Sequence, residues 1–352
     1  MRADRKGALQ NLKEELLYPK FYWEDRDSKK IFTAWGKSAK KEAVCCGIFP
    51  SPFLTEEHFF YPLFSSHQEA EALTPSLDFT CPDACQDFVH TPSQKEWESL
   101  VEKALIEITN KQFSKVVLAR STKLQLTDSL DPFAFLKTLK QYKSSVSFFL
   151  FSPSPDKAFV GATPEKLYTR KKNVLFSEAL AGTLKKGHTL RDFQEKEHQE
   201  LALVLPFFEE KLPQIATHWE WDKEPHLVPS ISVIHLRKKV EAYLKPSFHD
   251  LDIMNLLHPT PAIGGYPQKE ALQFIAKHEP FSRHFYAAPI GWFSSQEAEI
   301  GVTLRAVEIH NSSLTFFAGA GIVKGSEAGK EWEELEAKIA PLTSFWTDKA
   351  SL

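Results

Sequence analysis

Apolar residues follow two spacings along this chain, one helical and one strand-like. Helical spacing begins after Ser93, which can act as an N-cap. The apolar positions on that helix face are Trp97, Leu100, Val101, Ala104, Leu105 and Ile108. A second helix is predicted to open at Asp131–Pro132, since proline is well placed in a first helical turn.

Short apolar runs between turn residues predict strands over 115–126, 145–151, 157–162, 166–170 and 174–180. A polar helix is predicted over 192–211, kinked or divided by Pro206. The remaining predicted elements are strands over 218–222 and 232–244, helices within 250–278, strands over 299–310 and 313–323, and a helix over 326–342. Strands in runs with helices inserted between them predict an α+β fold with antiparallel sheets. Their alternation is too irregular for a doubly wound parallel sheet.

The domain boundary is harder to place because no Pro/Gly/Ser-rich linker follows residue 95. Before it, residues 21–36 read as a hairpin around a polar turn and residues 74–94 as a loop. We predict that residues 1–94 are an N-terminal subregion of the same domain as residues 95–352.

Composition excludes some functions. The 43 basic and 46 acidic residues give a net charge of −3, which provides no attraction for nucleic acid or an anionic membrane. No apolar run approaches the roughly 20 residues that span a bilayer. The first residues lack the apolar stretch of a signal peptide, so a cytoplasmic protein is expected. The four cysteines, in two local pairs, are interpreted as reduced thiols.

Two Glu-x-x-Glu pairs are the first candidate for chemistry. Glu197 and Glu200 share one face of a predicted helix, and Glu331 and Glu334 repeat the spacing. If the two helices met, four carboxylates would suit a hard cation such as Mg²⁺. Taken alone, such pairs are more often a solvated helix face.

Lys115 and Glu165 are candidates for acid–base chemistry. Lys115 opens a strand in which Val117 and Ala119 share its face, and burial there would lower its pKa and make it a general base. Glu165 follows a strand and could be a general acid if its pKa were raised. The ordinary alternatives are a lysine at a strand end and a solvated turn carboxylate.

Two further features suit a carboxylate ligand. Gly319 and Gly321 end an apolar strand, where their backbone N–H groups could approach an anion, unless they mark a bulge. Arg305 is predicted within a strand, and its guanidinium suits a carboxylate of a ligand or of a neighbouring Asp or Glu.

The order of these segments is specific. Eight segments over about residues 93–345 together resemble the chorismate-utilising enzymes, and isochorismate synthases among them. They are KVVLAR, GATPEKL, SEALAGT, the KExxE helix, HPTPAIGG, VTLRA, FAGAGIV and EWEELEAKI. The resemblance implies a fold in which large antiparallel sheets form a sandwich-like core with helices outside. It also implies an isomerase that reversibly converts chorismate to isochorismate, in menaquinone or siderophore biosynthesis.

The resemblance implies a role for each matching position. Lys115 would activate the water that adds at C2, and Glu165 would protonate the hydroxyl that leaves C4. Mg²⁺ would be held by Glu197, Glu200, Glu331 and Glu334. The substrate-binding positions are Thr260, Ala262, Tyr286, Arg305, Gly319, Ala320, Gly321 and Lys338.

The same resemblance leaves alternatives open. A salicylate synthase, which also eliminates pyruvate, shares these residues, although HPTPAIGG is the form typical of isochorismate synthases. Aminating relatives generally lack a lysine at the Lys115 position, so no glutamine amidotransferase subunit is expected, and a monomer is expected. A chorismate-binding protein without catalysis is the alternative from another class.

Overall fold

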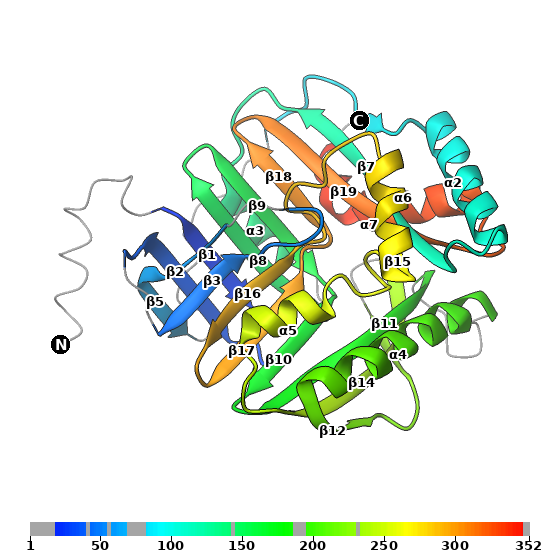
Figure 1. Ribbon diagram of the computed structural model, residues 1–352. Helices are drawn as coiled ribbons and strands as arrows, with labels where there is room; N and C mark the ends of the chain where they lie inside the picture. Colours follow the sequence, from blue (N-terminus) through cyan, green and yellow to red (C-terminus); the bar gives the residue numbers. More distant parts are fainter. Residues whose placement is uncertain are drawn as a thin grey trace.

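The computed structural model describes residues 18–39, 43–54, 58–68, 82–141, 145–185, 195–229 and 233–347. Two large antiparallel sheets lie against each other, with helices around them (Figure 1). The predicted α+β class and sandwich-like core are therefore confirmed.

The first sheet has ten strands in the described part of the chain. Its order is β15-β7-β19-β18-β9-β8-β1-β2-β5, with β6 also paired to β7. The strands are β1 (Lys20–Glu24), β2 (Ile31–Lys37), β5 (Pro62–Gln68), β6 (Val89–Thr91), β7 (Lys115–Gln125), β8 (Ser147–Ser154), β9 (Lys157–Thr163), β15 (Gly265–Tyr266), β18 (Ala306–His310) and β19 (Ser313–Val323).

The second sheet has nine strands within the described residues, in the order β12-β14-β11-β10-β17-β16-β3-β4, with β13 paired to β14. The strands are β3 (Val44–Ile48), β4 (His58–Phe60), β10 (Lys166–Lys171), β11 (Val174–Lys185), β12 (Ala216–Trp221), β13 (His226–Pro229), β14 (Val233–Leu244), β16 (Pro289–Ser294) and β17 (Glu297–Val302). Strands from before residue 94 thus belong to both sheets.

The described residues form six helices, the first two of which begin at capping side chains. They are α2 (Gln94–Thr109), α3 (Pro132–Leu139), α4 (Glu195–Ile215), α5 (Asp250–Leu257), α6 (Gln268–His278) and α7 (Ala328–Thr347). Ser93 forms a capping box with Glu96 at the start of α2. Helix α3 begins at Asp131–Pro132, as predicted, and the Asp131 side chain accepts hydrogen bonds from two of its backbone N–H groups.

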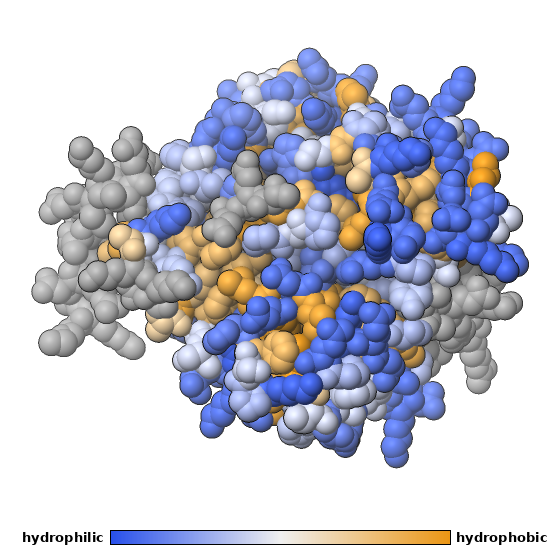
Figure 2. Space-filling model, in the orientation of Figure 1, coloured by the Kyte–Doolittle hydropathy of each residue, from blue (hydrophilic) through white to orange (hydrophobic). Residues whose placement is uncertain are grey.

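Two apolar clusters explain why the layers stay together. One lies between the sheets and continues under α4 and α5, with members such as Trp23, Phe149, Leu167 and Ile300. The other lies on the outer face of the first sheet, under α2, α3, α6 and α7. Figure 2 shows hydrophilic side chains over the helices and hydrophobic ones near the centre of this face.

Two predicted elements are corrected. Helix α4 includes both Pro206 and Pro213 and runs without division to Ile215. Burial of neighbouring apolar side chains such as Phe207 and Phe208 outweighs the hydrogen bond that proline removes. The strand predicted over 299–310 is broken into β17 and β18 by residues 303–305. No helix among the described residues has the length and apolar character needed to cross a membrane.

Candidate active site

Glu165 and Arg305 lie where the chain passes from one sheet to the other. Glu165 lies between β9 and β10, and Arg305 lies between β17 and β18. The two connections bind each other: Thr163 Oγ1 donates to the Val302 carbonyl at 2.6 Å, and the Val302 N–H donates to the Glu165 carbonyl at 3.2 Å. The Ala162 N–H donates to the Arg305 carbonyl at 3.1 Å. Thr163 and Val302, which are 139 positions apart in the sequence, are thereby neighbours.

Glu165 is buried, with 6% of its surface exposed. Burial raises the pKa of its carboxyl group to about 8, and the nearby Glu178 carboxylate acts in the same direction. The positive charges of Arg26, Lys115 and Arg305 oppose the rise. A carboxyl group with this pKa is mostly protonated at neutral pH, which is the state that a general acid requires.

The sequence predicted Arg305 within a strand, and this prediction is wrong. Arg305 lies in the connection between β17 and β18, with a φ of 49°. The break occurs because the backbone of Val302 is hydrogen-bonded to Thr163 and Glu165. Burial lowers the pKa of the Arg305 guanidinium, while Tyr286 and the carboxylates of Glu334 and Glu165 act in the opposite direction. A buried cation held on an unusual backbone conformation is suited to an anionic ligand.

Lys115 is the first residue of β7 and is buried, which is the condition that the hypothesis of a general base required. The predicted division of the strand into two faces is confirmed. Ala119 belongs to the cluster between the sheets, whereas Val116 and Leu118 belong to the cluster under the helices. Arg120 likewise faces α7, where its guanidinium lies 4.2 Å from the centre of the Trp332 ring. Lys115 therefore shares the inner face of the sheet with Ala119.

The glycines of β19 lie beside this face and do not form a bulge. Gly319 pairs with Ala119 and Gly321 with Val117, and the ladder keeps its register through Ala320. The Gly319 carbonyl accepts a hydrogen bond from Lys338 Nζ at 2.7 Å, so it points away from β7. Alternate residues of an antiparallel strand direct N–H and C=O to the same side. The N–H groups of Gly319 and Gly321 therefore face away from β7 as well.

Tyr286 and Lys338 both lie beside Gly319 of β19. Tyr286 stacks on Phe317 with ring centres 5.3 Å apart. A Cβ on Gly319 would lie 2.9 Å from the Tyr286 hydroxyl oxygen. Burial raises the pKa of Tyr286 to about 12, so its hydroxyl is a neutral hydrogen-bond donor. Lys338 Nζ also lies 2.5 Å from Glu334 Oε1, one helical turn away.

The HPTPAIGG segment connects α5 to α6 and lies beside the start of β7, because the Gly264 carbonyl accepts from the Val117 N–H at 3.0 Å. Both ring nitrogens of His258 and the Thr260 hydroxyl are buried without a hydrogen-bond partner among the described residues. Burial lowers the pKa of His258 to about 3, so the ring is neutral. Ala262, in the same segment, is half-buried. Buried polar atoms without partners indicate room for a polar ligand or water here.

The structure describes the side chains of only two of the four predicted metal ligands, Glu331 and Glu334. Glu331 is buried and Glu334 lies nearly one turn later on α7, with 23% of its side chain exposed. Glu197 and Glu200 lie in the first turns of α4, but their side chains lie outside the described part of the structure. Among the described side chains, no group of three or more potential ligands is assembled. The α7 pair nevertheless fits a hard cation, since Mg²⁺ prefers carboxylate oxygen ligands.

Two residues near Glu165 were not predicted. Arg26, from the β1–β2 turn, and Glu178, from β11, both contribute to the charge around Glu165. The sequence carried one signal for Arg26: the dense charge of the Asp25–Asp27 turn between two apolar strands. Glu178 belongs to SEALAGT, but spacing alone did not distinguish it from other strand carboxylates.

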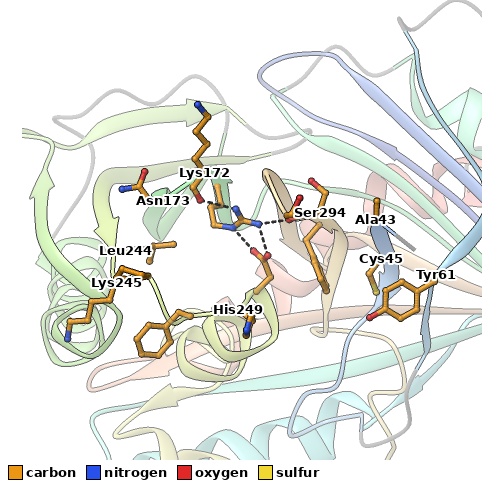
Figure 3. A pocket seen from close by; sticks show the side chains of 15 residues that line it. Ala43, Cys45, Tyr61, Lys172, Asn173, Leu244, Lys245, His249 and Ser294 are labelled. Atoms are coloured by element: carbon orange, nitrogen blue, oxygen red, sulfur yellow. Dashed lines mark hydrogen bonds and ion pairs between the residues drawn. The ribbon is translucent and has the colours of Figure 1, made fainter. Parts of the chain in front are cut away.

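A separate cavity of about 480 Å³ lies between β3, β10 and α5 (Figure 3). Its floor is the buried ion pair of Arg170 and Asp250, in which Arg170 Nη2 lies 2.7 Å from Asp250 Oδ2. None of the predicted site residues lines this cavity. The arginine is also bound by two backbone carbonyls, so its hydrogen-bonding capacity is used within the protein.

Known proteins match this arrangement. The family model described as chorismate binding enzyme matches residues 62–346. The chain belongs to the chorismate-binding enzymes. It is similar to isochorismate synthase MenF of Bacillus subtilis, with 33% identity over 83% of the chain and 66% of that protein. It is also similar to MenF of Haemophilus influenzae, with 28% identity over 99% of the chain and 91% of that protein. It spans about half, 47%, of a chloroplastic isochorismate synthase of Catharanthus roseus.

Solved structures show the same fold. The menaquinone-specific isochorismate synthase of Escherichia coli superimposes with a TM-score of 0.83, covering 95% of this chain and 91% of that one at 24% identity. Anthranilate synthase component I of Streptococcus pneumoniae gives a TM-score of 0.72, with 96% of each chain covered at 19% identity. The predicted family and its resemblance to isochorismate synthases are confirmed, and the chain is an enzyme of a family whose isochorismate synthases are isomerases.

Proposed function

We propose that this protein is an isochorismate synthase that converts chorismate to isochorismate reversibly and depends on Mg²⁺. The observation that carries the proposal is the buried Glu165, whose pKa of about 8 keeps it protonated within the electrostatic influence of Lys115 and Arg305. An acid, a candidate base and a carboxylate-binding cation are the three groups that this reaction needs.

Substrate binding is assigned to groups that face the open side of β19. Arg305 would pair with a carboxylate of chorismate, and the N–H groups of Gly319 and Gly321 would donate to carboxylate oxygens. The Tyr286 hydroxyl is a further donor at Gly319. Lys338, bound to the Gly319 carbonyl and to Glu334, would hold strand and helix in register around the ligand.

Glu331 and Glu334 would hold Mg²⁺, together with Glu197 and Glu200 of α4. When bound, Mg²⁺ would supply Lewis-acid polarisation of the ring carboxylate. Glu334 also acts electrostatically on Arg305, so the proposed metal and carboxylate sites adjoin each other.

Two residues of the chain carry out the two proton transfers of the reaction. Lys115, as the general base, takes a proton from the water that adds at C2. Glu165 gives its proton to the hydroxyl that leaves C4 as the double bond shifts. One hydroxyl replaces another, so the atoms balance without an oxidant. Because the nucleophile is water, we expect no amidotransferase subunit.

The product would serve menaquinone biosynthesis, as the name of the similar Escherichia coli enzyme suggests, or siderophore biosynthesis. We further propose that the protein acts in the cytoplasm and as a monomer. The test is incubation of the purified protein with chorismate and Mg²⁺, with products separated by chromatography. Isochorismate without pyruvate supports the proposal. Stoichiometric salicylate and pyruvate would identify a salicylate synthase, and chorismate binding without turnover would identify a non-catalytic protein.

A further inference from the structure

The turn between β1 and β2 holds the residues on both sides of Glu165. Lys166 Nζ lies 2.8 Å from Asp25 Oδ1 and 2.7 Å from Asp27 Oδ2. Arg26 donates from Nη1 to the carbonyl of Pro164. The N-terminal turn therefore fixes the residue before and the residue after the proposed general acid.

Arg26 also pairs with a second carboxylate in the same place. Its Nη2 lies 2.5 Å from Glu178 Oε2, and the two side chains are 1% and 3% exposed. Arg237 Nη1, from β14, lies 3.8 Å from the same oxygen. This buried carboxylate therefore lies beside two guanidinium groups, which compensate its charge. Glu178 Oε1 has no hydrogen-bond partner among the described residues, so no hydrogen-bond donor there compensates the charge on that oxygen.

Glu165 is thus faced by charged groups from four elements. They are Glu178 on β11, Arg26 in the β1–β2 turn, Lys115 on β7 and Arg305 between β17 and β18. Only Glu178 among them is negative, and it acts in the direction that protonates Glu165. Arg26 acts in the opposite direction on Glu165 while it holds Glu178 in place.

We propose that Glu178 and Arg26 are positioning residues that together set the protonation of Glu165, so that the N-terminal hairpin is a working part of the active site. The inference rests on the proposed function, in which Glu165 is the general acid. In this proposal Glu178 supplies the negative charge that keeps Glu165 protonated. Arg26 holds the Glu178 carboxylate in position and limits its effect on Glu165.

The test compares the pH dependence of kcat/KM in Glu178→Gln, Arg26→Gln and the wild type. Glu178→Gln should move the alkaline limb to lower pH by about one unit or more, since a like charge is removed from Glu165. Arg26→Gln should move it to higher pH with a lower plateau, because an opposing positive charge is lost and Glu178 loses the group that holds it in place. Glu220→Gln, at an exposed carboxylate of β12, is the matched control and should leave the limb unchanged.

A second measurement reports on Glu165 without turnover. The difference in thermal stability between the wild type and Glu165→Gln, followed from pH 5 to 10, titrates this one carboxyl group. The same difference in a Glu178→Gln background should titrate at lower pH. The double variant Arg26→Gln/Glu178→Gln covers the case in which one unpaired charge prevents folding, and its limb should lie between those of the two single variants.

The proposal is supported if the alkaline limb of the kcat/KM profile moves to lower pH in Glu178→Gln and to higher pH in Arg26→Gln. A merely structural role would lower activity in both variants without moving the limb in opposite directions. Unchanged limbs in folded variants, together with an unchanged stability titration, would overturn it. If the wild type forms no isochorismate while the stability titration still shifts with Glu178→Gln, the proposed function fails and the coupling between Glu178 and Glu165 stands.

Discussion

Burial and the charge of Glu178 keep Glu165 protonated to about pH 8, so its carboxyl group sets the alkaline limb of the pH dependence. Because the protonated form is the active one, kcat/KM should fall as pH rises through about 8. Glu165→Gln should reduce kcat by about 10²–10⁴-fold, since an amide cannot supply the proton. Steady-state kinetics with chorismate provide both measurements.

The control for this variant is Glu297→Gln, at an exposed position of β17, which should retain full activity. Chorismate binding by Glu165→Gln, followed by tryptophan fluorescence, should persist. A variant that retains more than about a tenth of wild-type activity would contradict the role of Glu165 as the acid.

Arg305 is the residue on which substrate affinity depends in this account. Arg305→Ala should weaken chorismate binding by about 2–4 kcal/mol, since a buried charge-assisted pair is lost. Arg305→Lys should recover only part of the affinity, because lysine keeps the charge but not the planar fork. A fluorescence titration measures both, with Lys123→Ala, an exposed lysine of β7, as the control. Wild-type affinity in Arg305→Ala would show that Arg305 serves the fold.

At the scale of elements, the central requirement is the close approach of β19 to Tyr286. A methyl group on Gly319 would lie 2.9 Å from the Tyr286 hydroxyl oxygen and 3.2 Å from the Leu118 carbonyl oxygen. Gly319→Ala should therefore lower the free energy of unfolding by about 1–3 kcal/mol through overpacking. It should also weaken chorismate binding, since the strand must shift.

A double-variant cycle with Tyr286→Phe tests that contact. Removal of the hydroxyl should recover at least about 0.5 kcal/mol of the stability lost in Gly319→Ala, as measured by urea denaturation. Strict additivity of the two substitutions would mean that the strain lies at the Leu118 carbonyl instead.

Elements with local signals were predicted from the sequence, and elements governed by distant contacts were not. Helices α2 and α3 were predicted because Ser93 and Asp131 cap them locally. The break between β17 and β18 was missed because it depends on hydrogen bonds from Thr163, which is distant in the sequence. Helix α4 continues through Pro206 because tertiary burial outweighs local preference.

The site divides in the same way. Lys115 and Glu165 lie in motifs that a family resemblance can identify, and their burial agrees with the sequence hypothesis. The pairing of Arg26 with Glu178 spans 152 positions, and no local pattern encodes a contact of that range. The only local signal of this pairing is the density of charged residues in the Asp25–Asp27 turn.

At the scale of the whole molecule, the metal prediction requires helices from distant parts of the chain to act together. Removal of divalent cations should abolish turnover, because the substrate loses the Lewis acid that polarises its ring carboxylate. Glu331→Gln and Glu334→Gln should show the same loss with the fold retained by circular dichroism. Isothermal titration with Mg²⁺ gives a readout independent of turnover. Full activity in excess EDTA, with negligible metal content, would refute the prediction.

The most direct test of the account as a whole is the origin of the new hydroxyl group. Chorismate and Mg²⁺ are incubated with the enzyme in H₂¹⁸O, and the earliest product is analysed by chromatography and mass spectrometry. The account predicts isochorismate that carries one solvent oxygen at C2, formed by the wild type and abolished in Lys115→Ala. Absence of isochorismate, unlabelled isochorismate, or labelled isochorismate from Lys115→Ala at the wild-type rate would contradict it.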